Sequence, residues 1–347
     1  MTPRPPPSEL LNWALSVLAP GGAGSNPALT VVAGDASNRR YFRAAIADSS
    51  YILVDAPPAT EKNEAFLAVR ELLAGAGVTV PALRGADMAR GYLLLGDLGD
   101  RLLLPELTPD CVDGRYREAM DVLLRIAAID MHGVPFPAYD ESLLREELGR
   151  FSTWFVEALL GYSPAAGEQA LIEAAFDVLV SSALEQPRVL VHRDFHSRNL
   201  MPQDGGGLGV IDFQDAVLGP ITYDLVSLLR DCYIRWPTAQ VQGWVEVYRE
   251  KLQTRGHLPA NVDAAGFLRW FDLMGLQRHI KVLGTFARLY LRDGKPAYLD
   301  DLPLVIRYVR DITAARAPEN PALAEFQRWF DERLSPLIAN QHWGVAA

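Results

Sequence analysis

Three polar side chains in the middle of the sequence have the types and spacing that phosphoryl transfer requires. Asp194 and Asn199 are five residues apart, and Asp212 lies thirteen residues further on. One carboxylate can take the proton of an attacking hydroxyl, while a second carboxylate and an amide can hold a magnesium ion against phosphate oxygens. We therefore interpret Asp194 as a candidate base, and Asn199 and Asp212 as candidate magnesium ligands.

The segments that carry these residues interrupt a long helical region. Apolar runs at 188–191 and 209–213 predict two short strands, and polar residues follow or end each run. The turn between them, 192–199, holds Asp194 and Asn199. Strand ends on a packed scaffold are suitable places for residues that must keep a fixed geometry.

Upstream of this island the sequence predicts a small β-rich lobe. Period-two patterns at 29–32, 41–46 and 51–54, separated by short turns, predict an antiparallel meander. The other elements expected here are helices at 9–18 and 64–76, an edge strand at 78–83 and a buried strand at 91–95. From about residue 105 the apolar spacing of three and four predicts helices at 115–130, 141–160, 166–184, 221–234, 238–253, 263–290, 300–314 and 321–337.

The predicted fold class is therefore α+β with two lobes. We expect a small antiparallel β-rich lobe at 1–98 and a large, mainly helical lobe at 99–347. A chain of 347 residues with 49% apolar residues can bury a sizeable core without a metal or disulfide. We expect Cys111 and Cys232 to be ordinary thiols, since they match no metal spacing.

The composition also excludes some partners. A net charge of −10 argues against nucleic acid as the main partner. No apolar run approaches the length of a membrane span, and the N-terminal sequence lacks the apolar region of a secretory signal. We expect a cytoplasmic monomer whose partners are small molecules.

The central segment resembles a known catalytic loop. His192-Arg193-Asp194, four residues and Asn199 are similar to the H-x-D-x-x-x-x-N loop of the protein-kinase-like superfamily, and Ile211-Asp212-Phe213 stands where those enzymes have their metal-binding Asp-Phe-Gly. The pattern most resembles the aminoglycoside phosphotransferase and choline kinase branch. The resemblance implies a two-lobed kinase fold, with Asp194 as catalytic base and Asn199 and Asp212 as magnesium ligands. It also implies that His192 and Arg193 brace the loop, and that Asp224 caps a helix and pins the loop.

The resemblance further implies an ATP site in the N-terminal lobe. Gly34, Ser37 and Asn38 lie where the family has its phosphate-covering loop, and Gly96, Asp97 and Leu98 fall where the main chain of such enzymes meets the adenine. One feature of the family is missing. The strand-three lysine that grips the inner phosphates falls near Asp55, and the first lysine of the chain is Lys62. Arginine can clamp phosphate in its place. The candidates are Arg39, Arg40 and Arg43, for which a solvated strand edge is the alternative interpretation.

Several blocks of sequence resemble the anomeric sugar kinases of peptidoglycan recycling. They are GDASNRRYFR at 34–43, VDAPP at 54–58, LLLGDLGD at 93–100, the loop at 192–200, DFQDA at 212–216 and the segment 276–299. This resemblance implies transfer of the γ-phosphate of ATP to the 1-hydroxyl of N-acetylmuramate and N-acetylglucosamine, which feeds UDP-N-acetylmuramate synthesis. In that group the lysine position is likewise not an obvious lysine.

The residues that meet the sugar are less well marked. N-acetylmuramate carries a carboxylate, and Arg278, Lys281 and Arg288 lie on one face of the expected helix at 276–290, with His279 a quarter-turn away. A solvated charged stripe explains them equally well. Two further sets could contact the acceptor: Glu147 and Trp154, which could also be core, and Gln214, Asp215 and Trp236, which follow the metal site.

Three rival hypotheses stay open. The first is another small-molecule kinase of the same fold, acting on an aminoglycoside, choline or a related alcohol. The second is a non-catalytic nucleotide-binding module, which only the missing lysine supports. The third is a protein kinase, which is disfavoured because no activation segment with an Ala-Pro-Glu-like end follows Asp212.

Overall fold

The computed structural model describes residues 5–18, 27–32, 38–46 and 48–344. These residues form two compact units. The first contains the described residues up to Leu103 together with Arg198–Asp215, and the second contains Leu104–Ser197 and the residues from Ala216 onward. An antiparallel sheet dominates the first unit and helices dominate the second, so the predicted α+β class is confirmed. The lobe boundary at residues 98 and 99 stays a prediction.

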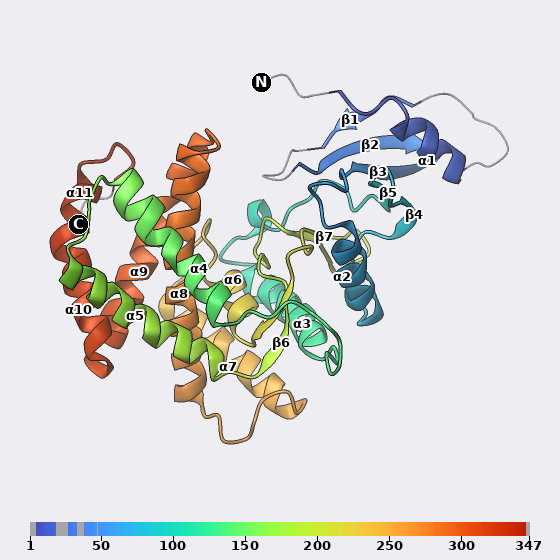
Figure 1. Cartoon of the computed structure of the whole chain (residues 1–347). Helices are drawn as coiled ribbons and strands as arrows, with labels where there is room; N and C mark the ends of the chain where they lie inside the picture. Colours follow the sequence, from blue (N-terminus) through green and yellow to red (C-terminus); the bar gives the residue numbers. More distant parts are fainter. Residues whose placement is uncertain (1–4, 19–26, 33–37, 47, 345–347) are drawn as a thin grey trace. The chain divides into compact units, whose positions relative to one another are not determined.

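The sheet of the first unit has the order β1-β2-β3-β5-β4, and every neighbouring pair is antiparallel (Figure 1, blue for β1 to β3 and cyan for β4 and β5). Its strands are β1 (Thr30–Val31), β2 (Arg40–Ile46), β3 (Ser49–Asp55), β4 (Leu83–Asp87) and β5 (Tyr92–Gly96). The first three strands form the expected meander. Alternate residues on β2, β3 and β5 turn Phe42, Leu53 and Leu94 into one core, on which helix α1 (Leu10–Leu18) packs Leu10 and Ala14.

The expected edge strand at 78–83 is displaced along the chain. The edge position belongs to β4, while Thr79 forms an isolated bridge with Gly209. The reason is the segment that joins this unit later in the chain. Its hairpin of β7 (Leu200–Pro202) and β8 (Leu208–Val210) donates the N–H of Val210 to the carbonyl of Thr79 at 2.8 Å. Helix α2 (Asn63–Gly75) completes the first unit.

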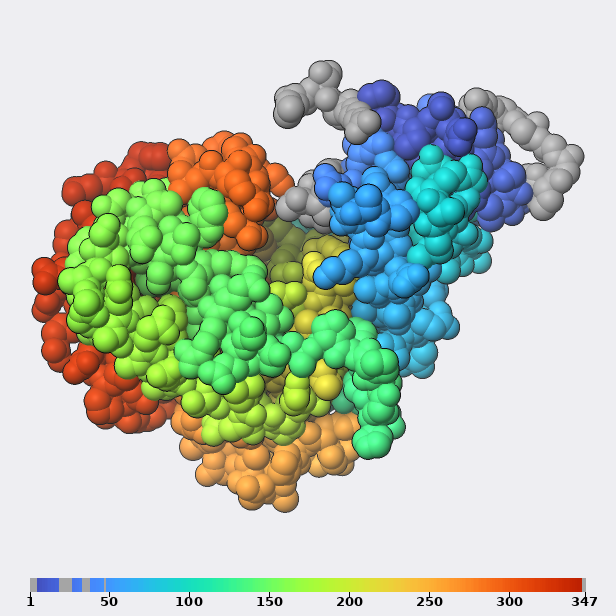
Figure 2. Space-filling view, viewed as in Figure 1, coloured from blue at the N-terminus to red at the C-terminus, as the bar shows by residue number. Residues whose placement is uncertain are grey.

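The second unit is built around one long helix, α8 (Ala264–Leu291), which is buried along most of its length and packs against α4, α5, α6 and α9. The helices, in chain order, are α3 (Val112–Ala127), α4 (Glu141–Arg150), α5 (Ala166–Leu184), α6 (Tyr223–Leu229), α7 (Thr238–Thr254), α8, α9 (Leu302–Arg316), α10 (Pro321–Trp329) and α11 (Ser335–Ala339). Strands β6 (Arg188–Val191) and β9 (Val217–Pro220) pair antiparallel among them. In Figure 2 the green helices, which include α4 and α5, form an outer face of this unit.

Two of the predicted helices end differently. The helix expected at 141–160 is α4 followed by a π-helical stretch, η2 (Phe151–Leu159). The helix expected at 221–234 is α6, which stops at Leu229 because Arg230 leaves the helical region. Short 3₁₀ or π turns make up the rest: η1 (Leu104–Glu106), η3 (Pro296–Leu299), η4 (Ala317–Glu319) and η5 (Phe330–Leu334). None of the helices in the described ranges has the length and apolar character needed to cross a bilayer.

Candidate active site

The loop after β6 has a backbone that two buried hydrogen bonds fix. Asp224 on α6 accepts the N–H of His192 at 2.6 Å and the N–H of Arg193 at 3.0 Å. Arg193 has a φ of 76°, in the left-handed region that side chains rarely adopt. The expectation that Asp224 pins this loop is therefore confirmed. The expectation that it caps the helix is wrong, because the N-cap of α6 is Thr222.

Asp194 follows the strained residue directly. Its N–H donates to Nδ1 of His192 at 3.2 Å, so the His192 ring supports the turn from inside the loop. Burial opposes ionisation of Asp194, but the nearby cations, Lys281 first among them, hold its pKa below the usual range. The side chain is an ionised carboxylate at neutral pH and can accept a proton or a hydrogen bond.

A second carboxylate fixes the other end of the loop in the second unit. Asp231 accepts the N–H of Ser197 at 2.9 Å and also the Ser197 hydroxyl. Asp231 is fully buried. It can reach Ser197 because α6 ends at Leu229. Sequence reasoning missed Asp231, since the apolar periodicity predicted a helix through this position and gave no signal for its end.

Most of the charged residues that were expected to face the sugar form ion pairs with one another. Glu147, which could contact the acceptor or belong to the core, is completely buried, and its carboxylate pairs with Arg193 and, at 2.9 Å, with Lys281. The hydroxyl of Tyr139 also donates to Glu147. Burial alone would raise the pKa of Glu147, yet Lys281 and Arg193 lower it to about 2. Glu147 and Lys281 are therefore bound to each other in the described structure, and contact of either with an acceptor sugar stays a prediction.

The two other candidates on α8 differ sharply from each other. The ring of His279 is fully buried and stacks on Tyr308 with ring centroids 4.6 Å apart, and its Nε2 lies 3.0 Å from the carbonyl oxygen of Arg230. Burial lowers the pKa of His279 to about 3, so it is not a cation and is not open to a ligand. The expected sugar contact of His279 stays a prediction that this burial does not favour.

Arg278 is a buried cation whose only hydrogen bond in the described structure is from Nη1 to Sγ of Cys232, at 3.2 Å. Its Nε is buried without a hydrogen-bond partner, and no carboxylate of the described residues pairs with it within 4 Å. Removing a charge from water without a counter-ion is costly, so such a group is a candidate for binding an anion. Arg278 stays a prediction as an acceptor residue.

In the first unit, two of the expected metal ligands lie side by side. Nδ2 of Asn199 is 3.2 Å from Oδ2 of Asp212, and Nε2 of Gln214 is 2.6 Å from Oδ1. Asp212 has a φ of 65°. The Oε1 atom of Gln214 is buried without a hydrogen-bond partner in the described structure, so this oxygen still has the capacity to bind a cation or a water. An acid and two amides are oxygen donors of the kind that Mg²⁺ prefers, so these residues fit that ion. The described residues contain no group of three His, Cys, Asp or Glu that could hold a metal by themselves, so a cation here would take further ligands from phosphate and water.

The arginines near the missing lysine have different surroundings. Arg40 lies opposite Asp55 across β2 and β3, with Nε 2.9 Å from the carboxylate. Arg43 binds Asp97 at 2.6 Å and Asp100 at 2.7 Å. Both of these arginines are therefore engaged in ion pairs within the first unit.

Arg39 is the buried arginine of this group. It is 2% exposed, lies 3.7 Å from Glu61, and places its guanidinium over the ring of Phe66 at 5.0 Å. Phe66 in turn stacks on Phe213, with ring centroids 4.9 Å apart. Arg39 is thus linked through two aromatic rings to the residue that follows Asp212.

The other nucleotide candidates are partly placed. Gly34 and Ser37 lie outside the described residues, and Asn38 donates its N–H to Glu61 at 3.1 Å. Asp97 binds Arg43 and accepts the Ser50 hydroxyl at 2.6 Å, so its side chain has a structural role. The N–H of Gly96 donates to Ala82 at 2.7 Å, and the carbonyl of Leu98 accepts from Gln203 at 3.4 Å.

The remaining acceptor candidates are at least partly accessible. Trp154 is half-buried on η2, whereas its neighbours Phe151 and Phe155 are fully buried core. Trp236 is half-buried and donates its indole N–H to the hydroxyl of Tyr116 at 3.0 Å. Asp215 is exposed.

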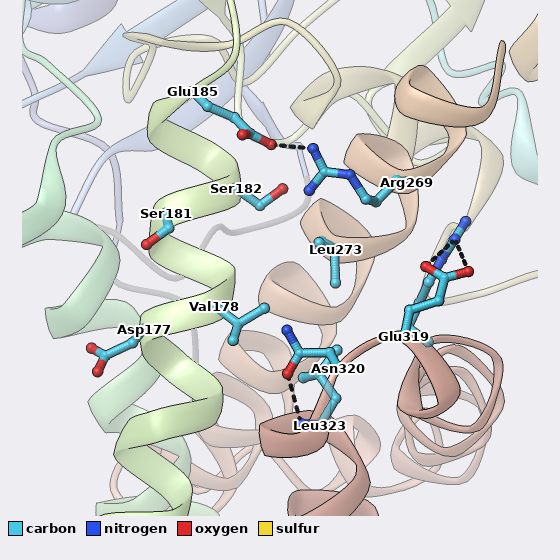
Figure 3. A pocket seen from close by; sticks show the side chains of 11 residues that line it. Asp177, Val178, Ser181, Ser182, Glu185, Arg269, Leu273, Glu319, Asn320 and Leu323 are labelled. Atoms are coloured by element: carbon cyan, nitrogen blue, oxygen red, sulfur yellow. Dashed lines mark hydrogen bonds and ion pairs between the residues drawn. The ribbon is translucent and has the colours of Figure 1, made fainter. Parts of the chain in front are cut away.

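A cavity of about 460 Å³ opens elsewhere in the second unit, between α5, α8 and the start of α10 (Figure 3). Val178, Leu273 and Leu323 supply its apolar lining. Its two arginines are already paired, Arg269 with Glu185 and Arg316 with Glu319. None of the expected site residues lines it.

Comparison with known proteins places these features in a family. Residues 28–259 match the model of the phosphotransferase enzyme family. The chain belongs to the phosphotransferase enzyme family.

Relatives of this phosphotransferase cover almost its whole length. It is 44% identical over 319 residues to an N-acetylmuramate/N-acetylglucosamine kinase of Pseudomonas putida, covering 92% of this chain and 90% of the relative. It is 45% identical over 291 residues to the protein of the same name from Pseudomonas aeruginosa, covering 84% and 85%. Among solved structures, the ADP-bound aminoglycoside phosphotransferase APH(2'')-Ib is similar with a TM-score of 0.57 at 13% identity, covering 88% of this chain and 98% of that one. That likeness confirms the kinase-like fold predicted from the catalytic loop.

Proposed function

We propose that this phosphotransferase is a sugar kinase that transfers the γ-phosphate of ATP to the anomeric 1-hydroxyl of N-acetylmuramate and N-acetylglucosamine. The observation that carries the proposal is the identity of 44–45% to two kinases named for these sugars, over most of both chains. The matches span 319 and 291 residues, and so extend well beyond the catalytic loop. The product would feed UDP-N-acetylmuramate synthesis in peptidoglycan recycling.

The proposed chemistry is one in-line displacement. Asp194 accepts a hydrogen bond from the sugar hydroxyl and takes its proton as the new oxygen–phosphorus bond forms and the bond to the leaving nucleotide oxygen breaks. The low pKa of Asp194 keeps it ionised for this task. An anomeric hydroxyl is more acidic than an ordinary alcohol, so a weak base is sufficient. Positioning of the reactants supplies most of the rate increase.

Asn199 and Asp212 are proposed to hold Mg²⁺, with Gln214 supporting Asp212 through the 2.6 Å hydrogen bond. When bound, the ion neutralises charge on the phosphate oxygens. The residues' own contribution is to present two oxygen ligands whose relative position the β7–β8 hairpin fixes, since Ile211 donates its N–H to the carbonyl of Asn199 at 3.1 Å.

We assign the task of the missing lysine to Arg39. Its guanidinium pairs with Glu61, just before α2. It also lies over the ring of Phe66, which stacks on Phe213, the residue after Asp212. Arg40 and Arg43 are less suited, because each is closely bound to a carboxylate of the sheet or its end. A guanidinium can bind phosphate oxygens through two parallel N–H groups.

Arg278 is the proposed partner of the acceptor's carboxylate. N-acetylmuramate carries a lactyl carboxylate that N-acetylglucosamine lacks, and Arg278 is a buried α8 cation without a carboxylate partner in the described structure. The charge of Arg278 also contributes to the low pKa of Asp194, after that of Lys281 and His196, so the two residues share one neighbourhood of the second unit. We further propose that the enzyme acts as a monomer in the cytoplasm, where its nucleotide is available.

A panel of acceptors tests the proposal. The purified chain is incubated with Mg²⁺ and ATP and with N-acetylmuramate, N-acetylglucosamine, kanamycin or choline, and the product is located by ³¹P NMR. We expect phosphorylation of the two amino sugars at the reducing end and none of the other acceptors. Phosphorylation of kanamycin or choline alone would overturn the sugar assignment, and nucleotide binding without transfer to any acceptor would favour a binding module.

A further inference from the structure

A buried polar cluster surrounds Glu147 in the second unit, and the proposed reaction assigns no task to it. It joins four parts of the second unit: α4 through Glu147, α6 through Tyr223, α8 through Gln277 and Lys281, and the loop through Arg193. Nζ of Lys281 lies 2.9 Å from the Glu147 carboxylate and 2.9 Å from the Tyr223 hydroxyl. Burying charges costs free energy, so a cluster of this size calls for a function.

Arg193 is held at both of its ends. Asp224 accepts its backbone N–H at 3.0 Å, and Glu147 pairs with its guanidinium. Between these anchors the backbone is in the left-handed region, with a φ of 76°. Such a conformation is unfavourable for a residue with a side chain and persists only where the surroundings impose it. The next residue is Asp194, so the direction of its side chain depends on Arg193 staying in place.

The position of Glu147 relative to Lys281 depends in turn on one close contact between helices. Gly284 lies three residues after Lys281 on α8, and Arg150 lies three residues after Glu147 on α4. A Cβ atom at Gly284 would overlap the carbonyl group of Arg150. The backbones of α4 and α8 therefore approach more closely than any other residue at 284 would permit. One helical turn away, this approach brings Glu147 and Lys281 within ion-pair distance.

The form of α4 at this contact is also unusual. The helix changes to the π-helical stretch η2 at Phe151, the residue whose N–H also lies against Gly284. Wide turns of this kind are rare and often accompany functional sites. The change follows the contact with Gly284 directly and leaves Glu147 on the regular helix before it.

We propose that Glu147, Lys281 and the Gly284–Arg150 contact form a positioning device that holds Arg193 and thereby sets the orientation of Asp194. Glu147 and Lys281 are positioning residues in this proposal, because the effect assigned to them on the reaction passes through Arg193. This role rests on the proposed function of Asp194, but not on which sugar is the acceptor.

Matched substitutions on two helices test the proposal. Glu147→Gln removes the charge of the buried acid, and Glu146→Gln makes the same change next to it on the exposed side of α4, where Glu146 pairs with Arg150. Steady-state kinetics with the full chain, ATP and the acceptor that the wild type uses separate kcat from KM. We expect Glu147→Gln to lower kcat about 100-fold with the KM for ATP within about threefold of wild type, and Glu146→Gln to change kcat less than twofold.

Lys281 supplies the conservative comparison. We expect Lys281→Met to lower kcat about tenfold or more and Lys281→Arg to restore much of that loss, because the charge beside Glu147 returns. The double variant Glu147→Gln/Lys281→Met removes one charge of each sign. It leaves neither member of this ion pair buried with its charge and without the other, so it serves as the test if a single variant does not fold. Since both residues act through Arg193, its kcat should lie within about threefold of the slower single variant.

Glycine substitutions test the helix contact. Gly284→Ala should lower kcat, whereas Gly243→Ala on α7, where an added Cβ meets no atom within 4 Å, should leave it unchanged. If Glu147→Gln and Gly284→Ala lower only the melting temperature, with kcat within threefold of wild type below that temperature, the cluster is structural and the proposal is overturned. A wild-type chain that transfers phosphate to no acceptor would contradict the proposed function instead, so the two failures are distinguishable.

Discussion

At the scale of single residues, this phosphotransferase lacks one cation that the kinase pattern leads us to expect, the lysine of the third strand. The third strand ends in Asp55 where a lysine is expected. Arg40, which lies opposite on the neighbouring strand, forms an ion pair with Asp55. Arg39, the next residue toward the N-terminus, points into a different environment beside Glu61 and Phe66. Adjacent strand residues face opposite sides of a sheet, which explains why two neighbouring arginines can have separate tasks.

Arg39→Met tests the assignment of the phosphate contact. We expect the KM for ATP to rise about tenfold and kcat to fall, because a two-pronged charged contact with phosphate is lost. Arg90→Met is the matched control in the same unit, since Arg90 is exposed and pairs with Asp87 at the surface. Unchanged kinetics for Arg39→Met, or equal effects of the two substitutions, would contradict the assignment.

Arg278→Met tests the acceptor contact. The lost charge should lower kcat/KM for N-acetylmuramate about tenfold more than for N-acetylglucosamine, because only the first sugar carries a carboxylate. Arg269→Met is the control on the same helix, where the exposed arginine pairs with Glu185. Equal losses of kcat/KM for the two sugars would mean that Arg278 supports the fold or Asp194 and does not bind the carboxylate of N-acetylmuramate.

At the scale of elements, the catalytic loop depends on where α6 begins and ends. In its first turn Asp224 accepts hydrogen bonds from the backbone N–H groups of two loop residues. Because the helix ends at Leu229, Asp231 lies outside it and can accept the N–H of Ser197. Two carboxylates seven residues apart, one in the first turn of a short helix and one just after its end, thus hold the two ends of one loop.

Asp224→Asn tests this support. An amide has one acceptor oxygen where the carboxylate has two, so one N–H of the loop loses its partner, at a cost of about 1–3 kcal/mol. We expect kcat to fall about 10- to 100-fold and the KM for ATP to stay nearly constant. Asp311→Asn serves as control, because this exposed acid pairs only with Arg235 in the described structure. A kcat equal to wild type in Asp224→Asn would show that the backbone holds itself without the carboxylate.

The elements also show which parts of the site could be predicted from sequence. Asp194, Asn199 and Asp212 could be found because phosphoryl transfer places them in one short segment with fixed spacing. The pair Glu147 and Arg193 could not, since 46 residues separate them and the buried acid falls on a face with ordinary core residues. The end of α6 could not be predicted from sequence either, because Arg230 and Asp231 interrupt the helix through tertiary contacts with Asp272 and Ser197.

At the scale of the whole molecule, the fold class followed from a change of period along the chain. Alternating apolar residues gave the antiparallel sheet, and spacing of three and four gave the helices around α8. The inclusion of Arg198–Asp215 in the first compact unit did not follow from any local pattern, because it depends on pairing between Thr79 and Gly209, 130 residues apart.

Stability should respond to pH through Glu147. Its pKa is lowered to about 2 in the folded chain from 4.5, so its contribution of about 3 kcal/mol is present above pH 4.5 and is lost as pH falls toward 2. Urea unfolding of wild type and Glu147→Gln measures the difference in the free energy of unfolding. That difference should be constant from pH 7 to 5 and shrink below about pH 4.5. A difference that stays constant to pH 3 would contradict the ionic role of this carboxylate.

The central claim is that Asp194 serves a transfer of phosphate to the anomeric hydroxyl of an amino sugar. The most direct measurement is ³¹P NMR of the product formed from Mg²⁺, ATP and N-acetylmuramate by wild type and by Asp194→Asn, with nucleotide binding measured in parallel. The account predicts a sugar 1-phosphate from the wild type, a loss of about 100-fold or more in the variant, and equal nucleotide binding in both. A variant that transfers phosphate at the wild-type rate, or a product phosphorylated at another hydroxyl, would contradict it.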